Sequence, residues 1–187
     1  MPNTSPMTYE RVAVVLQEIG MVSKQKAQSV LDDFAAYAHD ELKPYEVACT
    51  LVSFGLAVSV HADDIDYLEP GYAWLLEEAA AVTGGAVTVS DVRLHEGEFE
   101  GDSRDDVLEF RCNGRPVSIP AEHFSDEYYD QLAACDAIAE VSPDGDPRSF
   151  RLVDFARERH GVYDSIMVLT TPEQAQALQR DLGLTIR

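Results

Sequence analysis

Residues 108–119 read LEFRCNGRPVSI, and this stretch predicts a β-hairpin. Apolar residues alternate with charged or polar ones over Leu108–Cys112 and again over Val117–Ile119, which is the period-two pattern of strands with one buried face. Asn113-Gly114 lies between them and is typical of a two-residue turn, because both residues tolerate a positive φ. The hairpin therefore predicts antiparallel pairing within the fold.

Further strands are expected on both sides of the hairpin. Upstream, Val87 and Val89 share one parity, whereas Val92 and Leu94 share the other, so we expect a break or bulge near Ser90-Asp91. Downstream, two short apolar stretches favour strands. These stretches are Phe150–Phe155 and Ser165–Leu169.

Helices are predicted where apolar residues recur with a period near 3.6. Three of the expected helices are Tyr9–Ile19, one that Ser23 caps, and Pro70–Val82 ending at Gly84-Gly85. A fourth is capped by Ser125 and holds on one face Tyr128, Leu132, Cys135 and either Ile138 or Ala139. A fifth begins at Thr171-Pro172. The uncharged stretch Tyr45–Val60 fits a buried helix or a strand, and its length favours the helix.

The predicted elements do not alternate strictly between helix and strand. This order favours an α+β fold with a mainly antiparallel sheet and flanking helices. We expect one domain over residues 1–187, in which residues 1–66 form a helical extension or lobe and residues 67–187 form the α+β core. A separate lobe of fewer than seventy residues is marginal by size, so a single fold is preferred.

The composition sets limits on possible partners. The chain has 187 residues with 34 acidic and 14 basic side chains, a formal net charge of −20. Nucleic acid and anionic membranes are poor partners for such a surface, because both are polyanions. Residues 1–20 lack the apolar stretch of a secretory signal, and no uncharged stretch reaches the length of a membrane span, so we expect a cytoplasmic protein. Cys49, Cys112 and Cys135 are expected as core residues and not as disulfides.

The negative charge is regional. Residues 61–110 hold 14 acidic and two basic side chains, and most of the acidic ones fall in two predicted loops. An acidic loop surface attracts a basic protein, and exposed aromatic residues supply binding energy. The candidate partner-binding residues are Asp63, Asp64, Asp66, Tyr67, Glu96, Glu98, Phe99, Glu100, Asp102, Asp105 and Asp106. A solvated surface that keeps the protein soluble explains the same residues.

Sequence motifs of catalysis are weak. His61 with Asp63 and Asp64, or His95 with Glu96 and Glu98, are candidate metal ligands, but no His-x-x-x-His pair or twelve-residue calcium loop occurs. His123 follows a predicted strand, where a structural hydrogen bond is the favoured role. Arg148, Arg151, Arg157, Arg159 and His160 form the one basic concentration, and pairing with Asp144 and Asp146 is its simplest explanation. We assign no catalytic residue, metal or cofactor.

A pattern over about residues 70–187 resembles small acidic immunity proteins of bacterial polymorphic or contact-dependent toxin systems. The resemblance rests on the helix with Tyr72–Leu76 that ends at Gly84-Gly85, on the hairpin 108–119, and on the C-terminal segment Met167–Leu178. It implies an α+β, cytoplasmic, non-enzymatic protein that neutralises a cognate toxin. It carries over no site residue, because these proteins use surfaces that vary with the toxin.

Three hypotheses from different classes follow. The first is a non-enzymatic inhibitor, an immunity protein whose acidic surface occludes the active site of a basic toxin domain; mimicry of DNA is a variant. The second is a regulatory or adaptor domain that docks through the helical hairpin Tyr9–His39. The third is a metal-dependent hydrolase that uses the clusters at His61 or His95.

Overall fold

The computed structural model describes residues 5–62, 65–155, 161 and 163–187. In chain order its elements are α1 (Tyr9–Glu18), α2 (Lys24–Asp33), α3 (Pro44–Ser53), β1 (Ala57–Val60), α4 (Leu68–Val82), β2 (Val89–His95), β3 (Phe99–Glu100), β4 (Ser103–Cys112), β5 (Arg115–His123), α5 (Gln131–Glu140), β6 (Ser149–Asp154), β7 (Ser165–Thr170), α6 (Pro172–Leu182) and β8 (Thr185–Ile186). The α+β prediction is confirmed, since every strand pair is antiparallel among the residues that the structure describes.

The strands form two separate sheets. Sheet A has the order β1-β7-β6-β8, with β7 inside and buried along its whole length. In sheet B, β4 is the central strand: β5 pairs along one edge, and β2 and β3 follow one another along the other. The expected hairpin is the β4–β5 pair, and both Asn113 and Gly114 have positive φ. The expected break in β2 is a register shift between Ser90 and Arg93, with Asp91 at φ 54.

The free edge of β5 offers few hydrogen-bond donors. The Glu122 N–H donates to the Asp130 carboxylate (2.9 Å), so residues of its parity turn their N–H groups away from β4. Pro116 and Pro120 share that parity and carry no N–H. This edge is therefore poorly suited to pairing with another strand.

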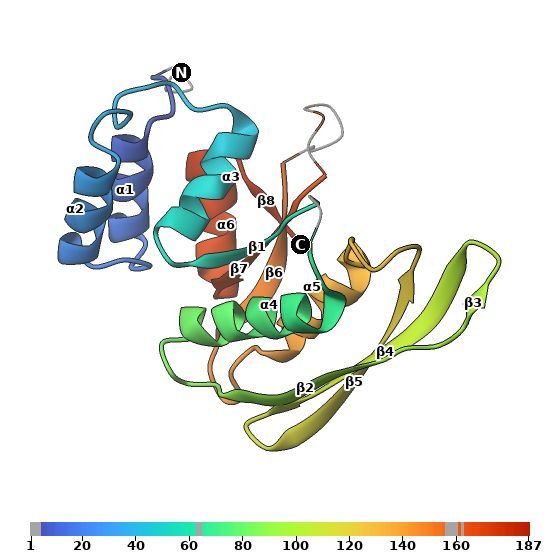
Figure 1. The fold of residues 1–187 in the computed structure, drawn as a ribbon. Coiled ribbons are helices and arrows are strands. Elements are labelled where there is room, and N and C mark those ends of the chain that lie inside the picture. Colours follow the sequence, from blue (N-terminus) through green and yellow to red (C-terminus); the bar gives the residue numbers. More distant parts are fainter. Residues whose placement is uncertain (1–4, 63–64, 156–160, 162) are drawn as a thin grey trace.

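Helices and sheets alternate in four layers (Figure 1). The helices α1, α3 and α6 pack on one face of sheet A, and α2 packs outside α1. The helices α4 and α5 lie between the other face of sheet A and the inner face of sheet B. Small residues at Ala79, Ala133 and Ala137 are fully buried there, which permits close approach of both sheets to the helices. Two apolar cores result, one on each side of sheet A.

Two element predictions are wrong in part. The stretch Tyr45–Val60 is α3 followed by β1, and β1 pairs with β7, so this strand belongs to the sheet and not to a helix. The helix expected after Ser125 begins at Gln131, because the Asp130 carboxylate accepts the N–H groups of Leu132 and Ala133. Ser125 instead accepts the Glu127 N–H (3.0 Å) in the preceding turn. The Thr171-Pro172 start of α6 is confirmed with its capping contacts.

Candidate protein-binding surface

Arg104 is the centre of a charged assembly at one end of sheet B. It lies on the inner face of β4 and is only 6% exposed. Its guanidinium pairs with Asp106 on the same strand (2.9 Å), with Glu96 from the β2–β3 connection (3.3 Å) and with Asp126 from the β5–α5 connection (2.7 Å). Burial alone lowers the pKa of Arg104, but the hydrogen bond with Asp106 and the nearby carboxylates outweigh it and raise the pKa.

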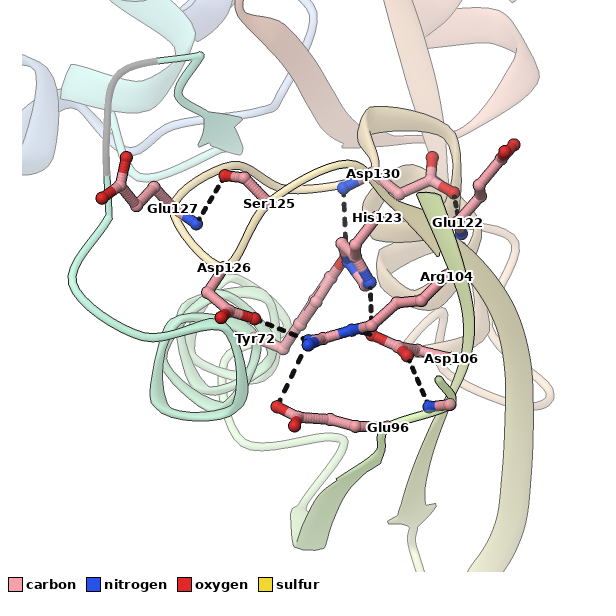
Figure 2. Close-up of polar contacts among 11 residues, drawn as sticks. Tyr72, Glu96, Arg104, Asp106, Glu122, His123, Ser125, Asp126, Glu127 and Asp130 are labelled. Atoms are coloured by element: carbon pink, nitrogen blue, oxygen red, sulfur yellow. Dashed lines mark hydrogen bonds and ion pairs between the residues drawn. The ribbon is translucent and has the colours of Figure 1, made fainter. Parts of the chain in front are cut away.

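A chain of buried hydrogen bonds supports Arg104 from inside (Figure 2). The Asp130 N–H donates to the Tyr72 hydroxyl (3.2 Å), which leaves the hydroxyl hydrogen for His123 Nε2 (2.8 Å). His123 Nδ1 then donates to Asp106 Oδ2 (2.8 Å), since a carboxylate only accepts. Each polar group in this series of hydrogen bonds therefore has a partner, and the series connects α4 to sheet B. The hydrogen bonding expected for His123 is confirmed.

Asp106 is held as a carboxylate inside the protein. It is 1% exposed, and its second oxygen accepts the Gly97 N–H (2.9 Å). Burial raises the pKa of Asp106, but the hydrogen bonds from Gly97, Arg104 and His123 outweigh burial and hold the pKa below its ordinary value. Gly97 approaches β4 so closely that a Cβ atom there would lie 2.3 Å from the Asp105 carbonyl oxygen. Glycine at this position therefore allows the contact with Asp106.

Arg104 joins the acidic segments 96–106 and 122–130, and a backbone hydrogen bond adds the segment 65–69. The Ile65 N–H donates to the Glu127 carbonyl (2.7 Å), so the first acidic segment lies against the β5–α5 connection. Figure 2 shows Glu96 and Asp126 converging on the same end of the Arg104 side chain. The described residues 65–69, 96–106 and 122–130 hold twelve acidic side chains and one basic one, which is eleven of the twenty net negative charges.

Exposed aromatic residues lie on the same segments. Tyr67 and Phe124 are 72% and 69% exposed. Phe99 is 51% exposed and its ring covers the Arg104 guanidinium, at 5.3 Å from the ring centroid. We call Asp66, Tyr67, Glu96, Phe99, Phe124, Asp126 and Glu127 together the acidic end. It combines carboxylates with aromatic rings, the side chains from which interfaces with basic proteins are built.

Most of the partner-binding residues predicted from the sequence are exposed. Asp66, Tyr67, Glu96, Glu98, Phe99, Glu100, Asp102 and Asp105 all reach solvent. The placement of Asp106 in an exposed loop is wrong, because β4 begins at Ser103 and turns Asp106 inward. Asp105 is on the opposite face of sheet B from Arg104. Asp63 and Asp64 lie outside the described residues.

Residues that the sequence reasoning missed complete the acidic end. Ser125 matches a cap residue, so the sequence predicts that Asp126 and Glu127 begin a helix and gives no sign that they contact a partner. Phe124 precedes this cap and belongs to no predicted element. Nothing in the sequence indicates that Asp126 and Glu96 share a partner, since they lie thirty residues apart and each pairs with Arg104.

The histidines predicted as metal ligands have other partners. His61 Nδ1 is 3.3 Å from Asp164, and His95 Nε2 is 2.7 Å from Glu109. Within the described ranges no group of three or more His, Cys, Asp or Glu side chains is arranged to hold a metal ion. Of the basic concentration, Arg148 is paired as expected and contacts Asp146 at 2.7 Å. Arg151 is not, because its Nε is buried without a hydrogen-bond partner among the described residues. Arg157, Arg159 and His160 lie outside the described residues.

Cys49, Cys112 and Cys135 form no disulfide within the described residues; Cys112 is buried, and Cys49 and Cys135 are partly buried. Burial raises the pKa of both Cys49 and Cys112, so neither is poised as a thiolate. None of the helices in the described part of the chain combines the length and the apolar character that crossing a bilayer requires.

Comparisons with protein-family models, with curated proteins and with solved structures return no match for this chain. The function is therefore argued from the acidic end itself, because a fold class alone does not determine function.

Proposed function

We propose that the chain is a non-enzymatic inhibitor that binds a basic protein through the acidic end, as a cytoplasmic immunity protein does when it covers the active site of its toxin. One observation carries the proposal. A buried arginine gathers Glu96 and Asp126 from two connections beneath the exposed ring of Phe99. The exposed rings of Tyr67 and Phe124 lie on two segments that a backbone hydrogen bond from Ile65 to Glu127 holds side by side.

The carboxylates and the aromatic rings of the acidic end contribute to binding in different ways. Carboxylates at the acidic end attract a cationic partner over several ångströms and raise the association rate, an effect that salt weakens. Aromatic rings that become buried on binding supply most of the energy and slow dissociation. Because Arg104 fixes Glu96 and Asp126 before binding, less conformational entropy is lost when the partner docks.

The burial of the hydrogen-bonded side chains of Asp106, His123 and Tyr72 favours inhibition over hydrolysis. Asp106, His123 and Tyr72 are connected in the order of a catalytic triad, carboxylate to imidazole to hydroxyl. All three side chains are buried, and burial also raises the pKa of the Tyr72 hydroxyl, so the phenol stays protonated. A substrate has no access to this hydroxyl. We therefore assign these residues to support of the acidic end.

The test is affinity capture of the tagged full chain from its native cells at low and raised salt, followed by binding kinetics with the captured protein. The informative variant is Tyr67→Ala with Phe124→Ala, which removes two exposed rings without touching the Arg104 pairs. The matched control is Tyr37→Ala, a similarly exposed ring that follows α2. We expect the double variant to raise the Kd at least about tenfold, mainly through faster dissociation, and the control to leave it unchanged.

The charge contribution has its own pair of variants. Glu96→Gln with Asp126→Asn neutralises two carboxylates at the acidic end, and Glu77→Gln with Glu78→Gln makes the same charge change on the exposed side of α4. The first pair should lower the association rate and its salt dependence more than the second. Equal effects of the two pairs, or a captured protein whose activity the chain leaves unchanged, would refute the proposal.

A further inference from the structure

Three large apolar side chains are exposed between the end of β5 and the first turn of α5. Phe124 is 69% exposed, Tyr128 47% and Leu132 71%. Single exposed apolar residues are ordinary on a protein surface, but three within residues 124–132 exceed a scattered exposure. We call Phe124, Tyr128 and Leu132 the apolar patch. It begins within the acidic end, at Phe124, and continues that surface as far as α5.

Packing of the core does not account for these exposed positions. The sequence predicts Tyr128 and Leu132 on the buried face of one helix, but α5 begins later and buries an alanine-rich face instead. Leu132 therefore points away from the core, in a first helical turn where carboxylates are the stabilising residues. Beside Tyr128, the ring of Tyr129 takes the inward position and packs on Tyr72, with the ring centroids 5.0 Å apart.

The backbone that carries the apolar patch is held at several points. Gln131 Nε2 donates to the His61 carbonyl oxygen (3.3 Å), and the Ile65 N–H donates to the Glu127 carbonyl oxygen (2.7 Å). The approach to α4 thus lies against this connection. The Asp130 carboxylate accepts N–H groups from both β5 and α5. A connection fixed in this way loses little conformational entropy when a partner covers it.

The charged residues next to the apolar patch in the chain are carboxylates. Asp126 and Glu127 project from the same connection (Figure 2), and Asp136 is exposed one turn after Leu132 on α5. Residues 116–147 contain neither lysine nor arginine, and the same holds for residues 65–69. The surface combines an apolar centre with an acidic rim, which suits a partner that supplies both apolar area and cations.

We infer that the apolar patch is the centre of the contact with the basic protein proposed above, and that this partner presents an apolar side chain surrounded by lysines or arginines. The inference rests on the proposed function. It adds Tyr128 and Leu132 to the binding surface and states the chemistry that covers them. A second copy of this chain is a poor occupant, because the carboxylates of both copies would meet around the apolar contact.

Two synthetic peptides of equal charge test this chemistry. The apolar peptide carries a leucine and a phenylalanine between two pairs of lysines, and the polar peptide carries two serines in their place. Each peptide is titrated into the full chain, and amide NMR shifts report where it binds. We expect the apolar peptide to bind at least about tenfold more tightly, because burial of one large apolar side chain supplies that factor. Its largest shifts should fall in residues 124–132, and equal affinities or largest shifts elsewhere overturn the inference.

Leu132→Ser separates the apolar patch from other exposed apolar residues. Because Leu132 is largely exposed, the variant should fold, and circular dichroism checks this. Leu132→Ser should remove the difference between the two peptides. The matched control Val14→Ser, at an exposed valine of α1, should keep it. A difference between the peptides that survives Leu132→Ser overturns the inference.

The protein captured in the test of the proposed function distinguishes the two proposals. Leu132→Ser should raise its Kd at least about tenfold, to the same extent at low and raised salt, since salt screens charges and not apolar contacts. If Tyr67→Ala with Phe124→Ala weakens binding and Leu132→Ser does not, the inference is wrong and the proposed function stands. If the peptides behave as expected but the chain leaves the captured protein's activity unchanged, the proposed function is wrong and the apolar patch keeps the ligand chemistry assigned to it.

Discussion

Replacing Arg104 by methionine tests whether the buried charge assembly determines stability. The substitution keeps an unbranched apolar stem but removes the cation that neutralises Asp106. The carboxylate is 1% exposed and would retain the N–H of Gly97 and the ring of His123, so it would be hydrogen-bonded without a counter-charge. Removing one partner of a buried pair costs about 3–5 kcal/mol, because the remaining charge is stranded away from water.

Urea unfolding followed by the fluorescence of Trp74, the single tryptophan, measures this cost. With a denaturant slope of about 2 kcal/mol/M, a loss of about 4 kcal/mol lowers the midpoint by about 2 M. Arg180→Met is the control, because Arg180 also pairs with an aspartate close in sequence, Asp181 at 2.6 Å, but on the surface. The control should hardly move the midpoint, since solvent screens exposed pairs.

A second variant separates the stranded charge from simple loss of packing. Arg104→Met combined with Asp106→Leu removes both charges, and it should recover part of the stability that Arg104→Met loses. The reasoning is refuted if Arg104→Met lowers the midpoint no more than Arg180→Met does. It is equally refuted if the double variant is the least stable protein of the set.

Three other perturbations probe the same region. Because the folded pKa of Asp106 lies below its unfolded value, the stability that this group contributes is complete above the unfolded pKa and is lost as the pH falls through the folded one. Between about pH 5 and pH 2 the Tm of the wild type should therefore fall more steeply than that of Asp106→Asn, and parallel curves by calorimetry would contradict this sign. Tyr72→Phe should cost about 1–3 kcal/mol in urea unfolding, because the Asp130 N–H and His123 Nε2 both lose their partner. Tyr129→Phe, whose hydroxyl has no hydrogen bond within the described residues, should cost clearly less, and equal losses would argue against the network. Gly97→Ala should destabilise by about 1–3 kcal/mol, since its Cβ would press on the Asp105 carbonyl, and an unchanged midpoint would show that the β2–β3 connection yields.

The hairpin of β4 and β5 was predictable because local signals agree there. Alternation, the Asn113-Gly114 turn and β-forming residues all favour the same register, and the structure confirms it. The strand β1 was not separable from α3, because both belong to one uncharged buried stretch in which period carries little information. The helix α5 was started too early, because Ser125 and Asp130 are both good cap residues and only the tertiary contacts decide between them.

The candidate surface was predictable in composition but not in arrangement. The segment 96–106, in which acidic residues recur between uncharged ones, is interpreted from the sequence as a loop, because strands are expected to turn apolar residues inward. Arg104 and Asp106 occupy inward positions of β4 instead, and their mutual pairing makes this burial tolerable. In a strand, alternate residues share a face, so the parity of each carboxylate decides which side of the sheet it lies on. A loop prediction for this segment gives no such parity. Asp105 and Asp106 are neighbours in sequence but point to opposite faces.

The position of α4 and α5 between the two sheets has a consequence for how the molecule opens. Sheet A and sheet B both pack on α4 and α5. Neither sheet can separate from these two helices without disturbing the layer on which the other sheet packs, so a local fluctuation of α4 affects both sheets at once. Backbone amides in α4, β4 and β7 are therefore expected to exchange with deuterium only through near-complete unfolding. The outermost helix α2 packs mainly on α1, and its amides should exchange earlier and on their own. The protein would then have one slow cooperative unit that spans both sheets, with a looser helical margin at its amino-terminal side.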